Sequence, residues 1–220
     1  LQLDLLGYLQ FHELSYVTLV VNILSTIFQE DFDKILEEDY PIDCELDYSK
    51  FLLSRCELLC PEPTYSSFLL VSAFLDNLIV CEAGDQECFE TLYISEFCLL
   101  VLYRRLFWKI FNSEEGHQNL KKFCDEFHKN FTDDSTLSDL RNTCVGLNWI
   151  KVVQDCVNAT DVHFSLEDVD IKQFENYYST LSYIDCKSEA SREIESLFPL
   201  CEMCKRESFA NIVDLSAKTT

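Results

Sequence analysis

Apolar residues recur along most of this chain at the three- and four-residue spacing of amphipathic helices. One long run of this kind, 87–111, is apolar over most of its circumference. The same spacing, together with the Pro and Gly residues that end the runs, predicts further helices at 14–38, 45–60, 64–81, 117–129, 135–156, 166–185, 188–198 and about 200–215. Strand signals are absent or short. The pattern therefore predicts an all-α fold, a bundle of about eight helices.

Composition agrees with this fold class. The 220 residues include only four Gly and four Pro, whereas all-β sandwiches need many tight turns that use these residues. A hydrophobic content of 48% is enough for a substantial core. We expect an N-terminal helical segment at 1–43, a disulfide-rich helical domain at 44–215 and a polar tail at 216–220.

The run at 14–28 has two interpretations. It is either a buried helix or the apolar core of a signal sequence retained in the chain. The residues before it include Asp4 and Glu13 and no Lys or Arg, which is atypical of a signal sequence. It is also short for a membrane helix, and Arg104 and Arg105 in the middle of 87–111 argue against a second one. No membrane span is expected.

Twelve cysteines are the strongest indication of compartment. Thiols at this density are typical of secreted or lumenal proteins, because cytosolic glutathione keeps thiols reduced. The even number allows every cysteine to pair, and spacing alone leaves the connectivity open. The cysteines are Cys44, Cys56, Cys60, Cys81, Cys88, Cys98, Cys124, Cys144, Cys156, Cys186, Cys201 and Cys204.

Two glycosylation sequons support a secreted glycoprotein. Asn130 begins Asn-Phe-Thr and Asn158 begins Asn-Ala-Thr, and both fit the acceptor pattern. Each sequon falls where a helical pattern ends, which is a position where a glycan can be carried. The sequence therefore predicts an extracellular, disulfide-bonded and glycosylated chain.

Motifs for catalysis and metal binding are missing from the sequence. Cys201-Glu202-Met203-Cys204 is a single CxxC, without a second pair or histidines at ligand spacing. Four isolated glycines cannot build a nucleophile elbow or a phosphate-binding loop. We therefore predict no enzyme activity, no cofactor and no metal.

The formal net charge of −22 narrows the class of partner. Nucleic acid and anionic membrane surfaces would be repelled. The charge instead favours a basic partner, reached by electrostatic steering.

One stripe on the 87–111 helix is a candidate binding surface. Ile94, Val101 and Trp108 recur every seven residues at the edge of the polar side, and Arg104 and Arg105 flank them. Trp and Arg dominate interface hot spots. Core packing is the alternative interpretation of the same stripe.

The resulting hypothesis is a secreted, disulfide-stabilised helical protein that binds an extracellular protein partner. The alternative is an extracellular carrier of a lipid or small apolar ligand, since seventeen Phe and ten Tyr could line a cavity. The run from Cys56 to Cys60 and the sequence Lys122-Phe123-Cys124 resemble those of secreted cysteine-rich helical domains of nematodes. This resemblance covers about residues 44–204 and implies secretion, disulfides and an all-α fold, without an assigned activity.

Overall fold

The computed structural model describes residues 11–37, 44–85, 90–160 and 162–185, which form helices and contain no strand. The all-α prediction is confirmed for this part of the chain. The predicted helices at 188–198 and 200–215 and the tail at 216–220 lie outside it.

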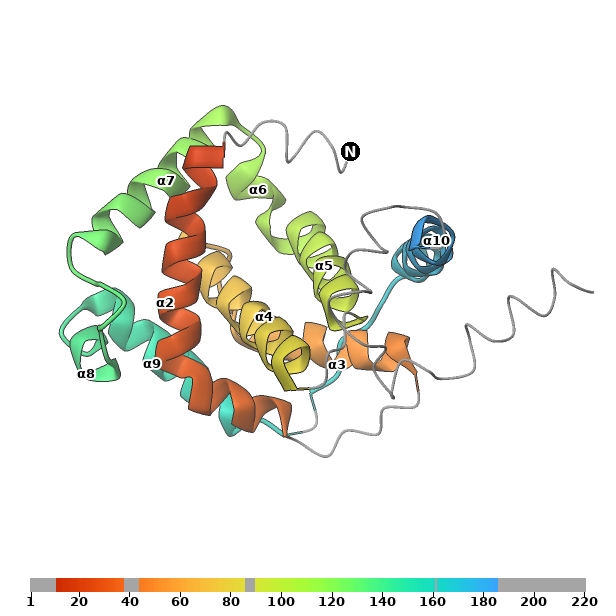
Figure 1. Cartoon of the computed structure of the whole chain (residues 1–220), viewed down its shortest axis with the longest axis horizontal. Helices are drawn as coiled ribbons and strands as arrows, with labels where there is room; N and C mark the ends of the chain where they lie inside the picture. The colour runs from red at the N-terminus through yellow and green to blue at the C-terminus, as the bar shows by residue number, and fades with distance from the viewer. Residues whose placement is uncertain (1–10, 38–43, 86–89, 161, 186–220) are drawn as a thin grey trace, which may run out of the picture. The chain divides into compact units, whose positions relative to one another are not determined.

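The helices follow the predicted runs closely, with two differences described below. Their order along the chain is α2 (Phe11–Leu36), α3 (Glu45–Leu58), α4 (Tyr65–Asp85), α5 (Glu90–Leu102), the π turn η1 (Tyr103–Phe107), α6 (Trp108–Phe111), α7 (Glu114–His128), α8 (Leu137–Leu140), α9 (Cys144–Val157) and α10 (Asp168–Asp185) (Figure 1).

The chain divides into two compact units, which do not coincide with the predicted boundary at residue 44. The first comprises the described residues of Leu1–Leu78 and Ser95–Ser165, and the second those of Ile79–Ile94 and Leu166–Thr220. Trp108, the pocket beside α9 and the buried cysteines of α3, α5 and α9 belong to the first unit, whereas Ile94 and Cys81 belong to the second.

The core of the first unit surrounds the N-terminal two thirds of α4. Phe74 meets Phe32 of α2 edge to face at 5.5 Å between ring centroids, and Phe68 meets Phe107 at 5.3 Å. On α9, Trp149 donates its indole N–H to the carbonyl oxygen of Ser66 at 3.0 Å. A helix with this many large apolar side chains is stable only when other elements cover them, and in this part of α4 they do so except on the half-exposed side of Ser72 and Asp76.

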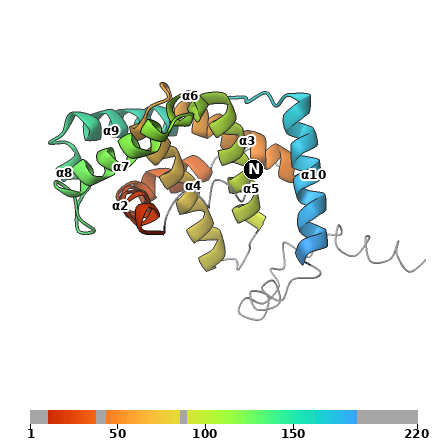
Figure 2. The ribbon, with the colours of Figure 1, turned by 90° about the horizontal axis from the view of Figure 1, so that it is seen from above.

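The apolar run at 14–28 lies within α2. Val20, Leu24 and Phe28 are buried there. The helix packs against α7 and α9, as the view along its axis shows (Figure 2). In the structure this run is therefore a helix of the core.

Two chain reversals share the sequence Asn-Ser/Thr-x-x-Gly, thirty residues apart. Ser113 begins α7 and accepts a hydrogen bond from the backbone N–H of Gly116 at 3.3 Å. Thr143 begins α9 and accepts one from Gly146 at 3.0 Å. A side chain on either glycine would collide with the preceding helix: a Cβ would lie 2.2 Å from the carbonyl oxygen of Ile110 or 2.1 Å from that of Leu140.

These reversals correct two sequence predictions. The single helix predicted at 135–156 is two helices, because a capping box of Thr136 and Asp139 starts α8 and Thr143 starts α9. Gly116 was expected to break a helix, but it lies in the first turn of α7. In each reversal the N-cap side chain defines the new helix, and the glycine lets it pack closely on the preceding one.

We expect Gly146→Ala to destabilise the protein although alanine is the better helix former by about 1 kcal/mol. The added Cβ meets backbone, which cannot rotate away as a side chain could. Overpacking of this kind costs about 1–3 kcal/mol. Urea unfolding should show a lower midpoint than the wild type. The exposed Lys151→Ala on the same helix serves as control and should change stability little, and an increase in the midpoint for Gly146→Ala would contradict the close packing of α9 on α8.

Candidate functional site

A π turn separates α5 from α6 and changes which side of the helix faces solvent. The backbone N–H of Trp108 bonds to the carbonyl oxygen of Tyr103, an i→i+5 pairing. Such a turn contains one residue more than an α turn, so residues after it are rotated by roughly 100° from the α register. π turns of this kind occur often at functional sites.

This rotation divides the predicted binding stripe. Ile94 and Val101 are buried, with exposed fractions of 2% and 1%, whereas Trp108 is 54% exposed. An uninterrupted α-helix would have kept Trp108 near the side of Val101, since residues seven apart share a face. The expectation of one continuous exposed stripe is therefore wrong for Ile94 and Val101, which belong to the core.

The two arginines of the stripe have different surroundings. Arg105 donates a hydrogen bond to the carbonyl oxygen of Ser165 at 2.9 Å, and its guanidinium lies 4.9 Å from the ring centre of Phe164. Arg105 therefore holds the segment that follows α9. Arg104 is exposed, as is Lys109, which was not among the predicted binding residues.

Aromatic rings beneath Trp108 fix its position. The indole meets Tyr103 edge to face at 6.0 Å, and Tyr103 stacks on Phe111 at 6.0 Å. Phe111 in turn contacts Phe68 of α4 at 4.9 Å. Burial raises the pKa of Tyr103, whose side chain lies partly within this stack. The exposed indole of Trp108 is therefore connected to the core through ring contacts. We name Trp108, Arg104 and Lys109 the Trp108 surface.

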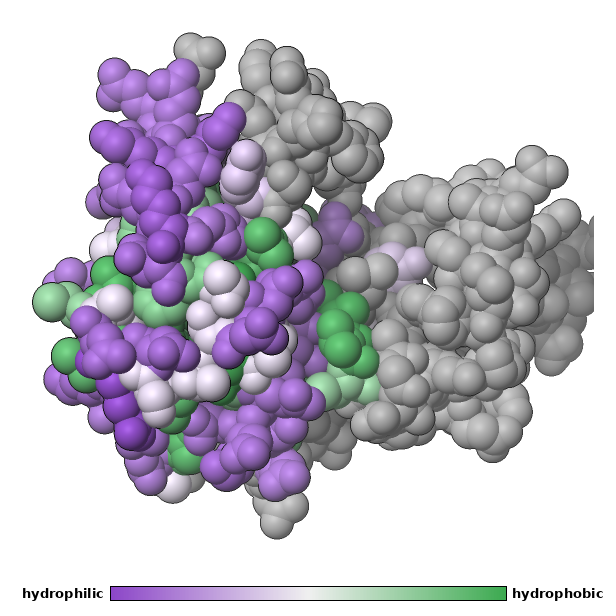
Figure 3. All heavy atoms as spheres, turned by 60° about the vertical axis from the view of Figure 1, so that its left-hand side comes forward, coloured by the Kyte–Doolittle hydropathy of each residue, from purple (hydrophilic) through white to green (hydrophobic). Residues whose placement is uncertain are grey.

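Another part of the surface of the first unit has a different character. The face that carries α7 and α8 is mainly hydrophilic, and its hydrophobic residues form small separate groups (Figure 3). Large apolar residues are also exposed on α9, where Leu147 is 52% exposed. Leu147 provides a matched control position, because its exposed fraction is close to that of Trp108.

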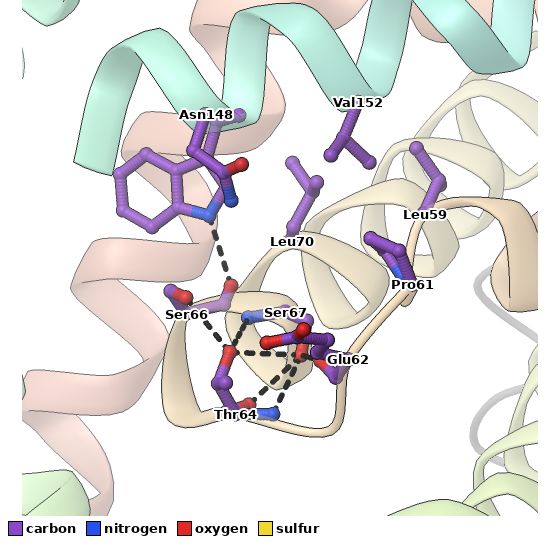
Figure 4. Close-up of a pocket in the computed structure, with 10 residues that line it drawn as sticks. Leu59, Pro61, Glu62, Thr64, Ser66, Ser67, Leu70, Asn148 and Val152 are labelled. Carbon is purple, nitrogen blue, oxygen red and sulfur yellow. Dashed lines mark hydrogen bonds between the residues drawn. The ribbon is translucent and has the colours of Figure 1, made fainter. Parts of the chain in front are cut away.

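A pocket of about 300 Å³ lies between the loop that joins α3 to α4 and the side of α9 (Figure 4). Leu59, Leu70 and Val152 form its apolar side. Its other side carries hydroxyl groups that are hydrogen-bonded to one another. The hydroxyl oxygens of Thr64 and Ser67 lie 3.1 Å apart, and the Ser67 hydroxyl also lies 2.7 Å from the carbonyl oxygen of Glu62, to which it donates. A hydroxyl-lined pocket of this size suits a small polar molecule better than a lipid chain.

Six of the described cysteines are free thiols in the structure, so the predicted disulfides are not seen among them. These residues are Cys44, Cys56, Cys60, Cys98, Cys124 and Cys144. Cys144 is the exposed one of the six, and Cys44 is half-buried. Cys156 is buried and donates to the carbonyl oxygen of Arg55 at 3.8 Å, and Cys81 is half-buried. The predicted disulfide residues Cys88, Cys186, Cys201 and Cys204 lie outside the described residues.

Both sequons are accessible at helix ends. Asn130 and Asn158 are exposed, and each side-chain amide donates to the carbonyl oxygen four residues earlier, at 3.1 Å and 2.6 Å. Asn158 is the C-cap of α9, and Asn130 follows the end of α7. The structure therefore leaves room for a glycan at either asparagine.

Within the described residues, no group of three or more His, Cys, Asp or Glu side chains could hold a metal ion. In the same part of the chain, no helix has the length and apolar character that crossing a membrane requires.

Comparison with protein-family models, curated proteins and solved structures found no match for this chain. Function is therefore inferred below from the chain's own residues.

Tryptophan fluorescence can test the rotation that the π turn introduces, because the chain has only two tryptophans. The structure buries one of them and exposes the other. Trp149 is 1% exposed and Trp108 is 54% exposed. We expect Trp149→Phe, which retains Trp108, to emit at long wavelength and to be quenched strongly by acrylamide. Trp108→Phe, which retains Trp149, should emit at shorter wavelength and be quenched weakly. Similar quenching of the two variants, with far-UV circular dichroism unchanged, would contradict the π-turn register.

The alkaline stability of the reduced protein should depend on Cys124. Burial, with a smaller contribution from the Asp125 carboxylate, raises the pKa of Cys124 from 9.0 to about 12. Between these values the folded protein keeps a proton that the unfolded chain has lost, so this stabilisation is complete below pH 9 and declines above it. Urea unfolding in reducing buffer measures the free energy of unfolding at each pH. Between pH 9 and 11 this free energy should fall less for Cys124→Ala than for the wild type. Cys144→Ala should match the wild-type slope, and equal slopes for all three proteins would refute the assignment.

Proposed function

We propose that this protein is a secreted, disulfide-stabilised and glycosylated helical protein that binds a protein partner through the Trp108 surface and has no catalytic activity. The supporting observation is the position of Trp108: a large aromatic side chain, more than half exposed, held on the core by stacked rings. A rigid exposed indole loses little conformational entropy on binding and buries a large area.

Local charge supports a particular kind of contact. Arg104 and Lys109 beside Trp108 are cationic on a chain whose formal net charge is −22. Such a surface fits a partner segment that presents a carboxylate next to an apolar or aromatic pocket. The positive charges of Arg104 and Lys109 would attract such a carboxylate.

Secretion is supported by the sequence features and by the accessibility of both sequons. Asn130 and Asn158 are exposed, so a glycan on either would disturb no packed side chain. The number of cysteines supports an oxidising compartment.

The carrier hypothesis has less support than binding through a surface. The pocket beside α9 has a volume of about 300 Å³, at the lower end of the range for small-molecule sites. Hydroxyl groups and Glu62 line one side of it, which is unfavourable for an alkyl chain.

We expect Trp108→Ala to weaken partner binding about 30-fold or more, since hot-spot residues contribute at least 2 kcal/mol. The partner would first be captured from extracellular fluid on the glycosylated wild-type protein, then purified and measured by calorimetry. Arg104→Ala should weaken binding less, and the loss should shrink in high salt.

Leu147→Ala is the matched control, because it removes an equally exposed apolar side chain from another helix. It should leave the affinity unchanged. Equal affinity of the Trp108→Ala and wild-type proteins for the purified partner would reject the Trp108 surface as the binding site.

A further inference from the structure

Buried cysteines from α5 and α9 converge on α3, which itself carries Cys56. Cys98 of α5 donates its S–H to the carbonyl oxygen of Ser49 at 3.7 Å, and Cys156 of α9 donates to that of Arg55 at 3.8 Å. Cys56, Cys98 and Cys156 are each exposed by 1% or less. Three helices distant in sequence therefore place thiols in one region of the core.

Cys156 and Cys98 both lie near Cys56, and each raises its pKa, Cys98 more than Cys156. They differ in the part of α3 that they contact, and Cys156 contacts the peptide unit of Cys56 itself. The Arg55 carbonyl that accepts from Cys156 belongs to the peptide unit that joins Arg55 to Cys56. Ser49, which accepts from Cys98, lies seven residues before Cys56, or about 10 Å along the helix. α3 also packs against α9, and the Arg55 guanidinium donates to the carbonyl oxygen of Ala159 at 3.0 Å.

We propose that Cys56 and Cys156 form a disulfide bond that joins α3 to α9. The proposal rests on the proposed secretion of the protein, which supplies the oxidising compartment. Both thiols lose their hydrogens as the S–S bond forms, and the two electrons and two protons pass to a disulfide of a thiol–disulfide oxidoreductase, which becomes two thiols. In the bonded protein the Cys156 sulfur faces Cys56 and, having lost its hydrogen, no longer donates to the carbonyl oxygen of Arg55.

The surroundings of Cys56 indicate when the bond forms. Burial raises the pKa of Cys56 well above 9.0, and the neighbouring Cys98, Cys156 and Cys60 raise it further. Because the thiolate is the attacking species, the packed core suppresses exchange. Oxidation therefore precedes the closure of α3 on α9. The folded reduced protein should then resist oxidised glutathione, whereas protein refolded in a glutathione buffer should acquire the bond.

Disulfide mapping tests the proposal directly, because the sequence separates the relevant cysteines. The secreted protein would be alkylated while denatured, deglycosylated, and cut without reduction by trypsin and a Glu-specific protease. Cleavage after Arg55 and Glu57 leaves Cys56 in the dipeptide Cys56-Glu57, and cleavage after Lys151 and Glu167 leaves Cys156 as the single cysteine of its peptide. Cys60 and Cys98 fall in other peptides. We expect the Cys56 dipeptide to be linked to the Cys156 peptide.

Variants distinguish the neighbouring pairings. Cys98→Ser should keep the link, whereas Cys56→Ser should leave Cys156 open to alkylation. Linkage of Cys56 to Cys98, or of Cys156 to Cys60, would overturn the proposal and leave secretion standing. A secreted product in which all cysteines can be alkylated without reduction would overturn both this pairing and the disulfide part of the proposed function. Since the wild-type map alone decides the pairing, poor folding of a variant does not affect the test.

Discussion

The first unit depends on the burial of α4. Most apolar side chains in the N-terminal two thirds of this helix are buried, and the side that carries Ser72 and Asp76 is half-exposed, so neighbouring elements must cover the remaining sides. Phe74 packs on α2, Phe68 packs on the π turn and α6, and the carbonyl oxygen of Ser66 accepts the indole N–H of Trp149 on α9. This last bond lets Trp149 be buried, because a buried indole N–H without an acceptor would destabilise the fold. Among these elements, α9 also carries Cys156 and forms one side of the pocket.

The helices could be predicted from the sequence because periodicity and capping residues act over a few neighbouring residues. The run at 45–60 became α3 and the run at 117–129 became α7, each within about three residues at either end. The two glycine reversals were missed because their signal is tertiary. Asn-Thr-x-x-Gly resembles an ordinary helix start, and only the approach of Leu140 to Gly146 shows that the residue must lack a side chain.

The candidate site could be predicted only in part for a related reason. Trp108 and Arg104 were recognised by residue type, which is a local property, whereas Arg105, chosen on the same ground, instead holds the segment after α9. The prediction that Ile94 and Val101 share their surface assumed an unbroken α register, and the π turn at Tyr103–Phe107 removes that assumption. No residue in that segment is Pro or Gly, so composition gives no warning of the turn. Packing explains it better: the turn allows Phe107 and Phe111 to contact Phe68 while Trp108 remains outside.

Charge acts on partner binding over two ranges, and the two ranges favour different groups on the partner. The net charge of −22 acts at distances near the Debye length, about 8 Å at physiological salt, and draws in a partner that is basic overall. At contact distance the positive charges of Arg104 and Lys109 dominate the local potential. They favour a partner carboxylate that lies next to the Trp108 indole. A partner with a basic surface around an acidic contact segment satisfies both conditions. Since the long-range field sets the association rate and the local contacts set the dissociation rate, salt and substitutions at Trp108 should act on different rate constants of the same complex.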